Sequence, residues 1–546
     1  MKKSSFVEGT LIATIAIVLT KILGMLYVIP FYSMVGTLGS ALYSYAYNIY
    51  VIFLDISSAG LPIAISKIIK EYNTLGMHEA KKRAYKISRD LITIISIIIF
   101  ISLFIFAKSF ATLILNGVTG GNTIEDITFV IRCISLAILV IPYLSVTKGY
   151  LQGHNIVGVS SVSQILEQIA RITIILVGCY LCINIFNVSI KYAIGISLIG
   201  ATVGGLVAIF YIKKKLHQNN NLIENANYEK KDQVTNKEII KKIAMYAVPF
   251  IIIDIAVSIY NFVDLILIMR TLGHLGFSGI DTEFISTSIA TYSCKISMIV
   301  SSIAMGMSVS LIPSIVEAYT LKHWKDVNHK LNNALQIILV ASVPMVLGLS
   351  LLAKPVWSIF YGNNEVGASI LALQIFVTLF FNLYTVTSST LQSMNKFKYV
   401  YISSLTGFIL NAILDVPMMY LFNYLGLPPY FGAIVATMLG YLSSIILALK
   451  ILSKEHKIDY KNTLNTMKNM IIPTVSMVLV VIILKMIIPI NLDSRMSSIL
   501  YVGIISIIGA FTYLLLCLKN KTLYEAFGEN RIKNIIKKLT RGRISL

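Results

Sequence analysis

Charged side chains interrupt several of the long apolar runs in this 546-residue sequence. A charge at the centre of a membrane helix costs about 2.5–3.5 kcal/mol on insertion scales, so it is normally paired or turned toward a cavity. Such a cation can bind an anion, and such a carboxylate can bind a cation. The first half of the chain carries Lys21, Asp55, Glu167 and Arg171, and the second half carries Asp254, Asp264, Lys295 and Asp415.

Helical spacing separates these charges into two kinds. Lys21 and Lys295 have no acidic residue three or four positions away, and this pattern indicates an anion-binding role. Glu167 and Arg171 lie four positions apart on one helix face, so we interpret them as a pair that neutralises itself. The alternative is that this pair has a functional role.

The elements that hold these charges are membrane helices. Hydrophobic residues make up 56% of the chain and charged residues 13%, against about 25% charged residues in soluble domains. Apolar runs of roughly 20 residues are long enough to cross a bilayer as helices. Fourteen such spans are predicted, near residues 10–33, 43–66, 91–115, 127–147, 159–183, 192–212, 243–269, 284–312, 331–353, 368–391, 399–421, 430–450, 468–489 and 497–518.

Lysine and arginine give the orientation of these spans. With the N-terminus in the cytoplasm, 36 of the 46 Lys and Arg residues lie in cytoplasmic segments, as the positive-inside rule requires. Both termini are therefore predicted to be cytoplasmic. The net charge of +21 sits in loops beside the bilayer, where anionic lipid attracts each residue by about 1 kcal/mol. This distribution favours anionic membrane lipids as partners and argues against nucleic acid.

Two segments recur about 240 to 247 residues apart. "LQGHN" (151–155) returns as "LQSMN" (391–395), and "IAISKIIKEYNT" (63–74) aligns with "SLIPSIVEAYTL" (310–321). We therefore predict an all-α integral membrane fold with two six-helix lobes related by a parallel repeat, plus two C-terminal helices. Its predicted parts are an N-terminal lobe (1–212), a cytoplasmic linker (213–242), a C-terminal lobe (243–450), spans 13 and 14 (451–518) and a basic tail (519–546).

Sequence motifs limit the chemistry that the chain can perform. It contains no Gly-Lys dipeptide, which excludes the phosphate-binding loop of a nucleotide motor. It also contains no H-E-x-x-H or G-x-S-x-G motif, so no enzyme is predicted. "CYLC" (179–182) lacks a second cysteine pair or histidines at ligand spacing, and we interpret its cysteines as small apolar residues. A transporter that works by alternating access is the class that these observations favour.

Several motifs resemble a known superfamily. They are "LTKILGMLYVIPFYSMVG" (19–36), "SIVEAY" (314–319) and "LQGHN", within the duplicated fourteen-span layout. These features resemble the multidrug/oligosaccharidyl-lipid/polysaccharide (MOP) flippase superfamily, and most closely its polysaccharide-biosynthesis branch, which includes stage V sporulation protein B and the lipid II flippases. The resemblance implies a V-shaped pair of lobes in the plasma membrane of a bacterium. It also implies a lipid-linked glycan precursor, carrying undecaprenyl pyrophosphate, as substrate.

The resemblance further implies which residues bind the substrate. Lipid II flippases of this branch place basic residues in the cavity on the first, second and eighth spans. Here Lys21 matches the first span and Lys295 the eighth. The second-span position holds Leu54 beside Asp55, and Tyr27 occupies another first-span position where a basic residue is expected. We therefore expect Lys21, Asp55 and Lys295 to contact the substrate.

Some members of the superfamily bind sodium in the second lobe, and the resemblance implies a similar site here. Asn411 and Asp415 are four residues apart and share a helix face. Thr437 and Asp264 are predicted at a similar depth, in the outer half of the membrane. Carboxylate, amide and hydroxyl oxygens together suit a hard cation. Asp254 is predicted nearer the middle and is set aside, and the alternative role for Asn411 and Asp415 is capping at a proline kink.

The favoured function is a flippase that moves a lipid-linked cell-wall precursor from the inner to the outer leaflet. One alternative is a cation-coupled multidrug exporter of the same superfamily. Cationic drugs favour a cavity lined by carboxylates, so Lys21 and Lys295 argue against that alternative. The other alternative is a scaffold that recruits cell-wall synthesis proteins without transport, and such a protein has no need to retain charge inside the membrane.

Overall fold

The computed structural model describes residues 6–529 and 532–533, apart from residues 59, 116, 119 and 219–233. The described part of the chain is helical and contains no strand, as predicted. Parts of the predicted linker and of the basic tail lie outside the described residues. Packing divides the chain into two compact units, Met1–Ala290 (unit 1) and Thr291–Leu546 (unit 2).

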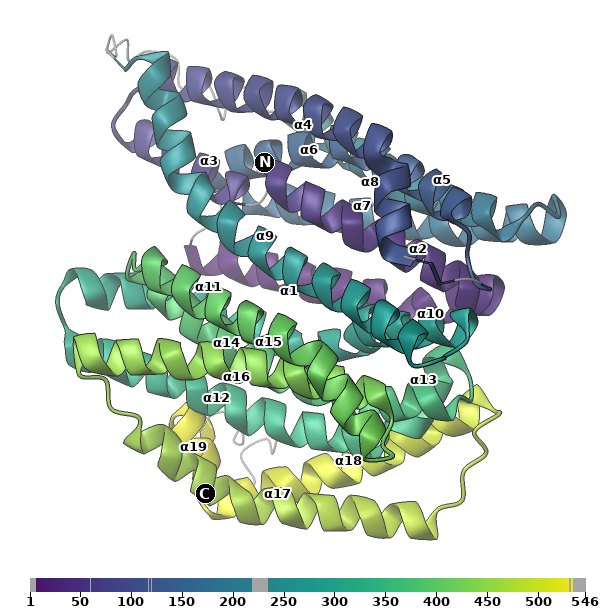
Figure 1. The fold of residues 1–546 in the computed structure, drawn as a ribbon. Helices are drawn as coiled ribbons and strands as arrows, with labels where there is room; N and C mark the ends of the chain where they lie inside the picture. The colour runs from purple at the N-terminus through teal and green to yellow at the C-terminus, as the bar shows by residue number, and fades with distance from the viewer. Residues whose placement is uncertain are drawn as a thin grey trace. The chain divides into compact units, whose positions relative to one another are not determined.

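The helices of each unit follow one another along the chain (Figure 1). Unit 1 contains α1 (Phe6–Leu26), α2 (Val28–Ser58), α3 (Leu61–Thr74), α4 (His78–Leu115), α5 (Ile124–Ser135), η1 (Leu136–Leu139), α6 (Ile141–Gly153), α7 (Val157–Tyr180), η2 (Leu181–Ile185), α8 (Ile190–Gln218), α9 (Asn236–His274) and α10 (Gly279–Thr287). Unit 2 contains α11 (Ser293–Thr320), α12 (Trp324–Leu351), α13 (Ala353–Tyr361), α14 (Glu365–Ser393), α15 (Phe397–Tyr424), α16 (Pro429–His456), α17 (Lys461–Ile487), α18 (Arg495–Lys519) and α19 (Thr522–Phe527).

The first predicted span is interrupted near its outer end. α1 ends at Leu26 and α2 begins at Val28, because Pro30 lacks an N–H and its ring clashes with the carbonyl four residues earlier. α2 is itself kinked at Gly36, where the backbone leaves helical geometry with a φ of 65° that is open to glycine but strained for other residues. Within the described chain, 13 helices are long and apolar enough to cross a membrane, and Ile15–Leu26 is a shorter apolar helix. The count of fourteen spans stays a prediction.

The recurring Leu-Gln-x-x-Asn motif ends a helix in both halves of the chain. Asn155 (φ 60°) and Asn395 (φ 56°) adopt the left-handed conformation just after α6 and α14. In each case the backbone N–H after the asparagine donates to the carbonyl of the motif's leucine at 2.9 Å. This is the hydrogen-bond pattern of a Schellman helix end, in which asparagine is a common substitute for glycine. The motif therefore returns because two equivalent helices end in the same way.

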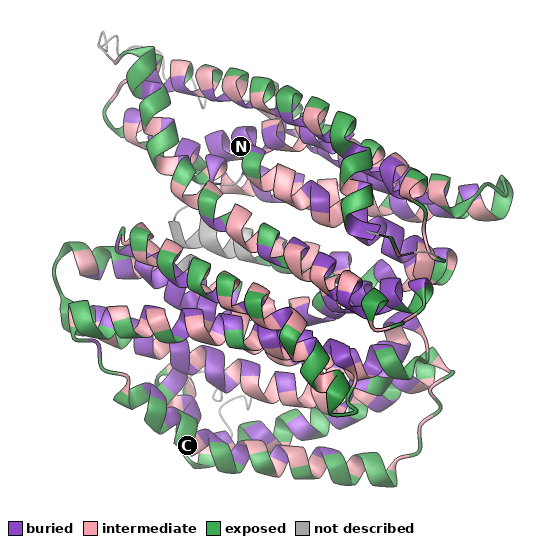
Figure 2. Cartoon of the chain, viewed as in Figure 1, coloured by how far each residue is buried: buried purple, intermediate pink, exposed green. Residues whose placement is uncertain are grey.

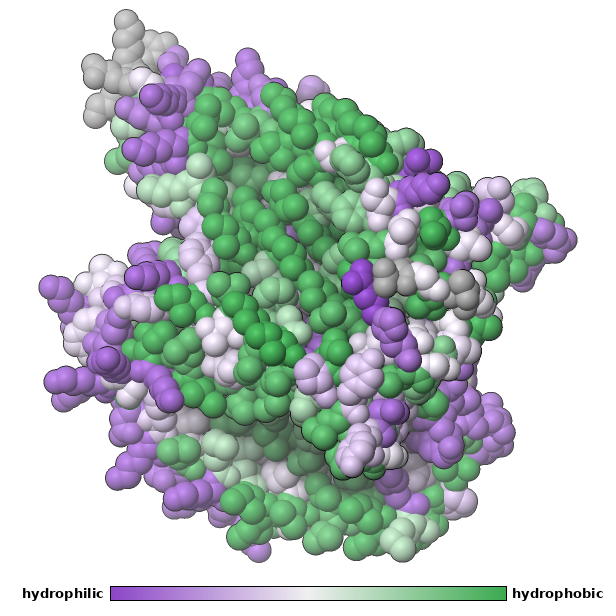
Figure 3. Space-filling view, viewed as in Figure 1, coloured by the Kyte–Doolittle hydropathy of each residue, from purple (hydrophilic) through white to green (hydrophobic). Residues whose placement is uncertain are grey.

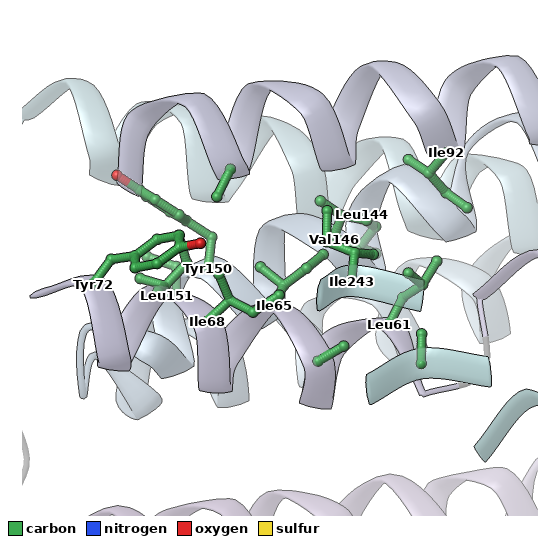
Figure 4. Packing of buried hydrophobic residues seen from close by; sticks show 14 of the residues in the cluster. Leu61, Ile65, Ile68, Tyr72, Ile92, Leu144, Val146, Tyr150, Leu151 and Ile243 are labelled. Atoms are coloured by element: carbon green, nitrogen blue, oxygen red, sulfur yellow. The ribbon is translucent and has the colours of Figure 1, made fainter. Parts of the chain in front are cut away.

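The helix that ends at Asn155 also packs closely on α3. A Cβ built on Gly149 would lie 2.6 Å from the carbonyl oxygen of Pro62, and one built on Gly153 would lie 2.8 Å from that of Ser66. Glycine at both positions lets the two backbones approach, as small residues do between membrane helices. Buried side chains of α3, α4, α6 and α9 form a hydrophobic core around this contact (Figure 4).

α9 packs in unit 1, although the repeat assigns it to the C-terminal lobe. Figure 1 shows it as a long teal helix, and it contacts α2, α3 and α4. Lys242 Nζ lies 2.5 Å from Glu71 Oε1 on α3, and a Cβ built on Gly60 would lie 2.6 Å from Phe250 Cβ. The boundary between the compact units therefore falls after residue 290 rather than in the linker 213–242. Packing and repeat topology group α9 differently, and the lobes defined by the repeat stay a prediction.

The exposed surface of α4 shows which solvent surrounds the helices. Its exposed residues include Ile94, Ile98, Ile101 and Ile105, whereas Ser96 on its inner side is buried. Figure 2 shows this exposed stripe, and Figure 3 shows that it is hydrophobic, with hydrophilic residues gathered near helix ends. A surface helix in water has the opposite pattern, with its apolar stripe inside. α4 therefore presents its apolar side to lipid.

Candidate functional site

Lys21 lies on the face of α1 that meets α7. Its side chain is half-buried, and α1 packs along α7. Gly24, three residues further along the same helix face, is so close to α7 that a Cβ built on it would lie 3.3 Å from Gln168 Nε2. The predicted substrate residue Lys21 is therefore held at a helix–helix boundary inside unit 1.

Asp55 lies where α2 meets α9. Its half-buried carboxylate accepts a hydrogen bond from the Ser258 hydroxyl of α9. Asp254, which the sequence set aside as an ion ligand, is one turn before Ser258 on α9 and is exposed. The α2–α9 boundary thus carries two carboxylates on neighbouring turns. Helical spacing alone does not reveal this arrangement, because the two aspartates lie on different helices.

The predicted Glu167–Arg171 pair does not form. Glu167 Oε2 lies 2.7 Å from Nζ of Lys148 on α6, whereas Nη2 of Arg171 donates to the Tyr43 hydroxyl of α2 at 3.0 Å. The guanidinium carbon of Arg171 is also 5.3 Å from the ring centroid of Tyr47. Each charge binds a group on another helix instead. The turn at Asn155 brings α6, with Lys148, beside Glu167, and the packing of α2 brings Tyr43 beside Arg171.

Tyr27, where the resemblance implies a basic residue, lies at the junction of α1 and α2. Its ring centroid is 6.2 Å from that of Phe31, which is 5.2 Å from that of Tyr43. Tyr27 thus belongs to the aromatic cluster that surrounds Arg171. Tyr43 and Tyr47 are not recognisable as site residues from the sequence, since no local spacing connects them with Arg171, which is 128 positions from Tyr43 in the chain.

In unit 2, Lys295 is half-buried in the first turn of α11. Asn411 and Asp415 are fully buried on one face of α15, at 0% exposure, and Thr437 of α16 is buried at 8%. α15 is assigned as one helix through Pro417 to Tyr424, so neither polar residue lies at a helix end.

Close approach of α15 and α16 brings these three residues to one stretch of their boundary. A Cβ built on Gly407 would lie 2.6 Å from the carbonyl oxygen of Gly440, and one built on Gly432 would lie 2.4 Å from that of Met418. Asn411, Asp415 and Thr437 all fall between these two contacts in the antiparallel pair. The Thr437 hydroxyl donates to the Ala433 carbonyl at 3.0 Å.

The fourth predicted ion ligand, Asp264, is half-buried on α9 in unit 1. Among the described residues, no group of three or more His, Cys, Asp and Glu side chains could hold a metal ion. All five cysteines are free thiols. The donor oxygens within unit 2 are thus one carboxylate, one amide and one hydroxyl.

Comparison with known proteins identifies the class. A search of solved structures finds the lipid II flippase MurJ in an inward closed conformation, with a TM-score of 0.62, 17% identity and coverage of 94% of this chain and 99% of that one. It also finds an inward-facing MATE multidrug transporter of the MOP superfamily, with a TM-score of 0.61, 16% identity and coverage of 80% and 96%. The fold is therefore the one found in the membrane transporters of the MOP superfamily.

The sequence comparisons narrow the class to a family. The profile of the polysaccharide biosynthesis protein family matches residues 6–319, and the MatE profile matches residues 249–416. The chain is 32% identical over 523 residues to the lipid II flippase MurJ of Bacillus subtilis, covering 94% of each protein. It is 24% identical over 415 residues to stage V sporulation protein B of the same organism, covering 74% and 76%. The chain therefore belongs to the polysaccharide biosynthesis protein family of the MOP superfamily.

Proposed function

We propose that this protein is a flippase that moves a lipid-linked cell-wall precursor, carrying undecaprenyl pyrophosphate, from the inner to the outer leaflet. The observation that carries the proposal is that half-buried lysines, Lys21 and Lys295, stand in membrane helices of both units. A cation inside a membrane helix is energetically costly, and binding an anionic transported group gives it a function there. The full-length similarity to a lipid II flippase supports the same substrate class.

In this mechanism the chain supplies charge and hydrogen bonds to the head group while the polyprenyl tail stays in lipid. Lys21 and Lys295 face the pyrophosphate as compact cations, without the bidentate geometry of arginine. Asp55 accepts hydrogen bonds from hydroxyl groups of the glycan. Alternating access then exposes these side chains to one leaflet at a time. The basic cytoplasmic loops lie against anionic lipid at the inner surface.

We also propose that sodium binding drives the cycle. The donors within unit 2, Asn411, Asp415 and Thr437, suit a hard cation, because all three supply oxygen and are buried. Asp264 of α9 is the further ligand that the sequence predicts. Sodium would supply the charge that lets a buried carboxylate stay ionised. Thr437 is suited to this role because its hydroxyl donates to Ala433 and so presents its oxygen lone pairs elsewhere.

Reconstitution tests the proposal directly. Purified protein in proteoliposomes is expected to move fluorescent lipid II between leaflets, and depletion in cells is expected to accumulate lipid-linked precursor on the cytoplasmic side. Transport of cationic dyes without movement of lipid II would favour the multidrug exporter, to which the MatE match points. Absence of both activities, with loss of cell-wall synthesis on depletion, would favour a scaffold for cell-wall synthesis proteins.

A further inference from the structure

We propose that Arg171, with the tyrosines around it, forms an anion-binding site in unit 1 that takes a phosphate or pyrophosphate group. The contacts of Arg171 alone define the site. Its assignment to the pyrophosphate of a transported lipid rests on the proposed function.

The depth of Arg171 makes its charge expensive. It lies 14 residues after the start of α7 at Val157, which is about 21 Å along a helix that crosses the membrane. α8 fixes the orientation of this turn, because a Cβ built on Gly204 would lie 2.5 Å from the Glu167 carbonyl oxygen and 3.3 Å from Arg171 Cβ. With α8 against one side, the Arg171 side chain extends toward α2, where it meets Tyr43.

The groups around the guanidinium are neutral. Nη2 donates to the Tyr43 hydroxyl at 3.0 Å, and the Tyr47 ring lies 5.3 Å from the guanidinium carbon. The Tyr43 and Tyr47 rings stack at 6.0 Å with an interplanar angle of 13°, so they form one aromatic wall. A tyrosine side chain carries no charge at neutral pH. Ring and hydroxyl contacts orient the guanidinium without cancelling its charge.

The nearest carboxylate on the same helix, that of Glu167, forms an ion pair with another residue. Glu167 is bound to Lys148 at 2.7 Å, and among the residues that the structure describes Arg171 forms no ion pair. Lys148, Glu167 and Arg171 together therefore carry a net charge of +1. Arg171 is half-buried, and among the described residues its side chain makes one hydrogen bond, from Nη2 to Tyr43, which leaves further N–H groups to donate to a ligand. A guanidinium has five N–H donors in a planar fork that matches phosphate oxygens.

The test compares variants of the full-length protein in detergent. Binding is measured by thermal shift and by competition, with inorganic pyrophosphate, undecaprenyl pyrophosphate and phosphatidylglycerol as separate probes. Arg171→Gln is expected to weaken undecaprenyl pyrophosphate binding at least tenfold, and Arg171→Lys to restore part of it. Tyr43→Phe removes the hydroxyl contact while keeping the ring, and is expected to cause a smaller loss in a folded protein.

Arg132→Gln is the matched control. Arg132 lies 5.0 Å from the Phe104 ring centroid, so it also places a guanidinium over an aromatic ring, but its side chain is exposed. This variant is expected to bind as the wild type does. Wild-type binding by a folded Arg171→Gln protein would overturn the site, and so would an equal loss in Arg132→Gln.

The outcomes separate this site from the proposed function. If the wild type flips lipid II and Arg171→Gln binds undecaprenyl pyrophosphate normally, the site is wrong and the function stands. If Arg171 is needed for undecaprenyl pyrophosphate binding but lipid II is not flipped, the site stands and the function fails. Arg171-dependent binding of phosphatidylglycerol alone would overturn the assignment to a pyrophosphate and identify the ligand as a bulk lipid headgroup.

Discussion

Asn122 binds the buried carboxylate of Glu283 through both its backbone and its side chain. Its backbone N–H donates to Oε1 at 2.6 Å and its Nδ2 donates to Oε2 at 2.5 Å, across 161 positions in the chain. Nδ2 also donates to the Leu38 carbonyl at 3.0 Å. Glu283 is only 1% exposed. This contact fastens the loop before α5 to α10 within unit 1.

Replacing Asn122 should therefore destabilise the protein. Asn122→Ala leaves Glu283 with one hydrogen bond fewer in a buried place, and such a loss costs about 1–3 kcal/mol. The measurement is the free energy of unfolding in detergent. Asn363→Ala is the control, because Asn363 Nδ2 makes an exposed hydrogen bond to Asp493 at 3.2 Å and its loss should stay within about 0.5 kcal/mol. If both variants lower the free energy of unfolding equally, the buried contact with Glu283 contributes no more stability than an exposed hydrogen bond.

The helix ends at Asn155 and Asn395 should tolerate glycine and reject β-branched residues. Both asparagines have a positive φ, at 60° and 56°. Glycine and asparagine tolerate this left-handed conformation, whereas a β-branched residue is destabilised there by roughly 1–2 kcal/mol. Asn155→Val should lower the thermal midpoint, and Asn155→Gly should leave it nearly unchanged. The same contrast is expected at Asn395. A valine variant as stable as the wild type at both positions would contradict this account of the repeat.

The orientation in the membrane predicts which side a labelling reagent reaches. Ser189 lies in the exposed connection before α8, and Gln218 ends α8 on the predicted cytoplasmic side. In a background without native cysteines, Ser189→Cys should react with an impermeant thiol reagent in intact cells. Gln218→Cys should react only after the membrane is opened. Reversed labelling would invert the topology that the positive-inside rule predicts.

The sequence predicted the helices well because their signals are local. Twenty apolar residues identify a span wherever it packs, and the Leu-Gln-x-x-Asn motif marks two helix ends by backbone geometry alone. Contacts between helices are different, since they depend on how the helices pack together. Spacing within one helix paired Glu167 with Arg171, yet Lys148 lies closer to Glu167 across a turn. Asn122 and Glu283 share no local pattern at all, and only the packing of α10 on α2 and α9 explains why they meet.

Mutation of the intramembrane lysines tests whether they bind the substrate. Lys21→Ala and Lys295→Ala should abolish lipid II flipping while leaving membrane insertion intact, because removal of a charge makes insertion easier. Lys→Arg at either position should retain activity, since the positive charge remains. Lys485→Ala is the control. Lys485 also lies in a membrane helix, but it is near the end of α17 and donates to the Leu351 carbonyl. Full complementation of a depletion strain by both alanine variants would refute the anion-binding role.

The sodium proposal predicts a salt-specific effect on stability. A ligand that binds only the folded protein stabilises it by mass action, so sodium should raise the thermal midpoint in detergent more than choline does at equal ionic strength. Asp415→Asn should remove most of this difference, because Asp415 supplies the buried carboxylate of unit 2.

Asp254→Asn separates the proposed ion ligands from the other intramembrane carboxylates. Asp254 is exposed beside the Ser258 that binds Asp55, so its loss should leave the sodium shift largely in place, whereas Asp264→Asn should reduce it. If sodium and choline shift the midpoint equally, the effect is screening of surface charge, which depends on ionic strength alone. The opposite result is that Asp254→Asn removes the sodium shift and Asp264→Asn keeps it. That result would place the ion site at the α2–α9 boundary, where Asp55 is the second carboxylate.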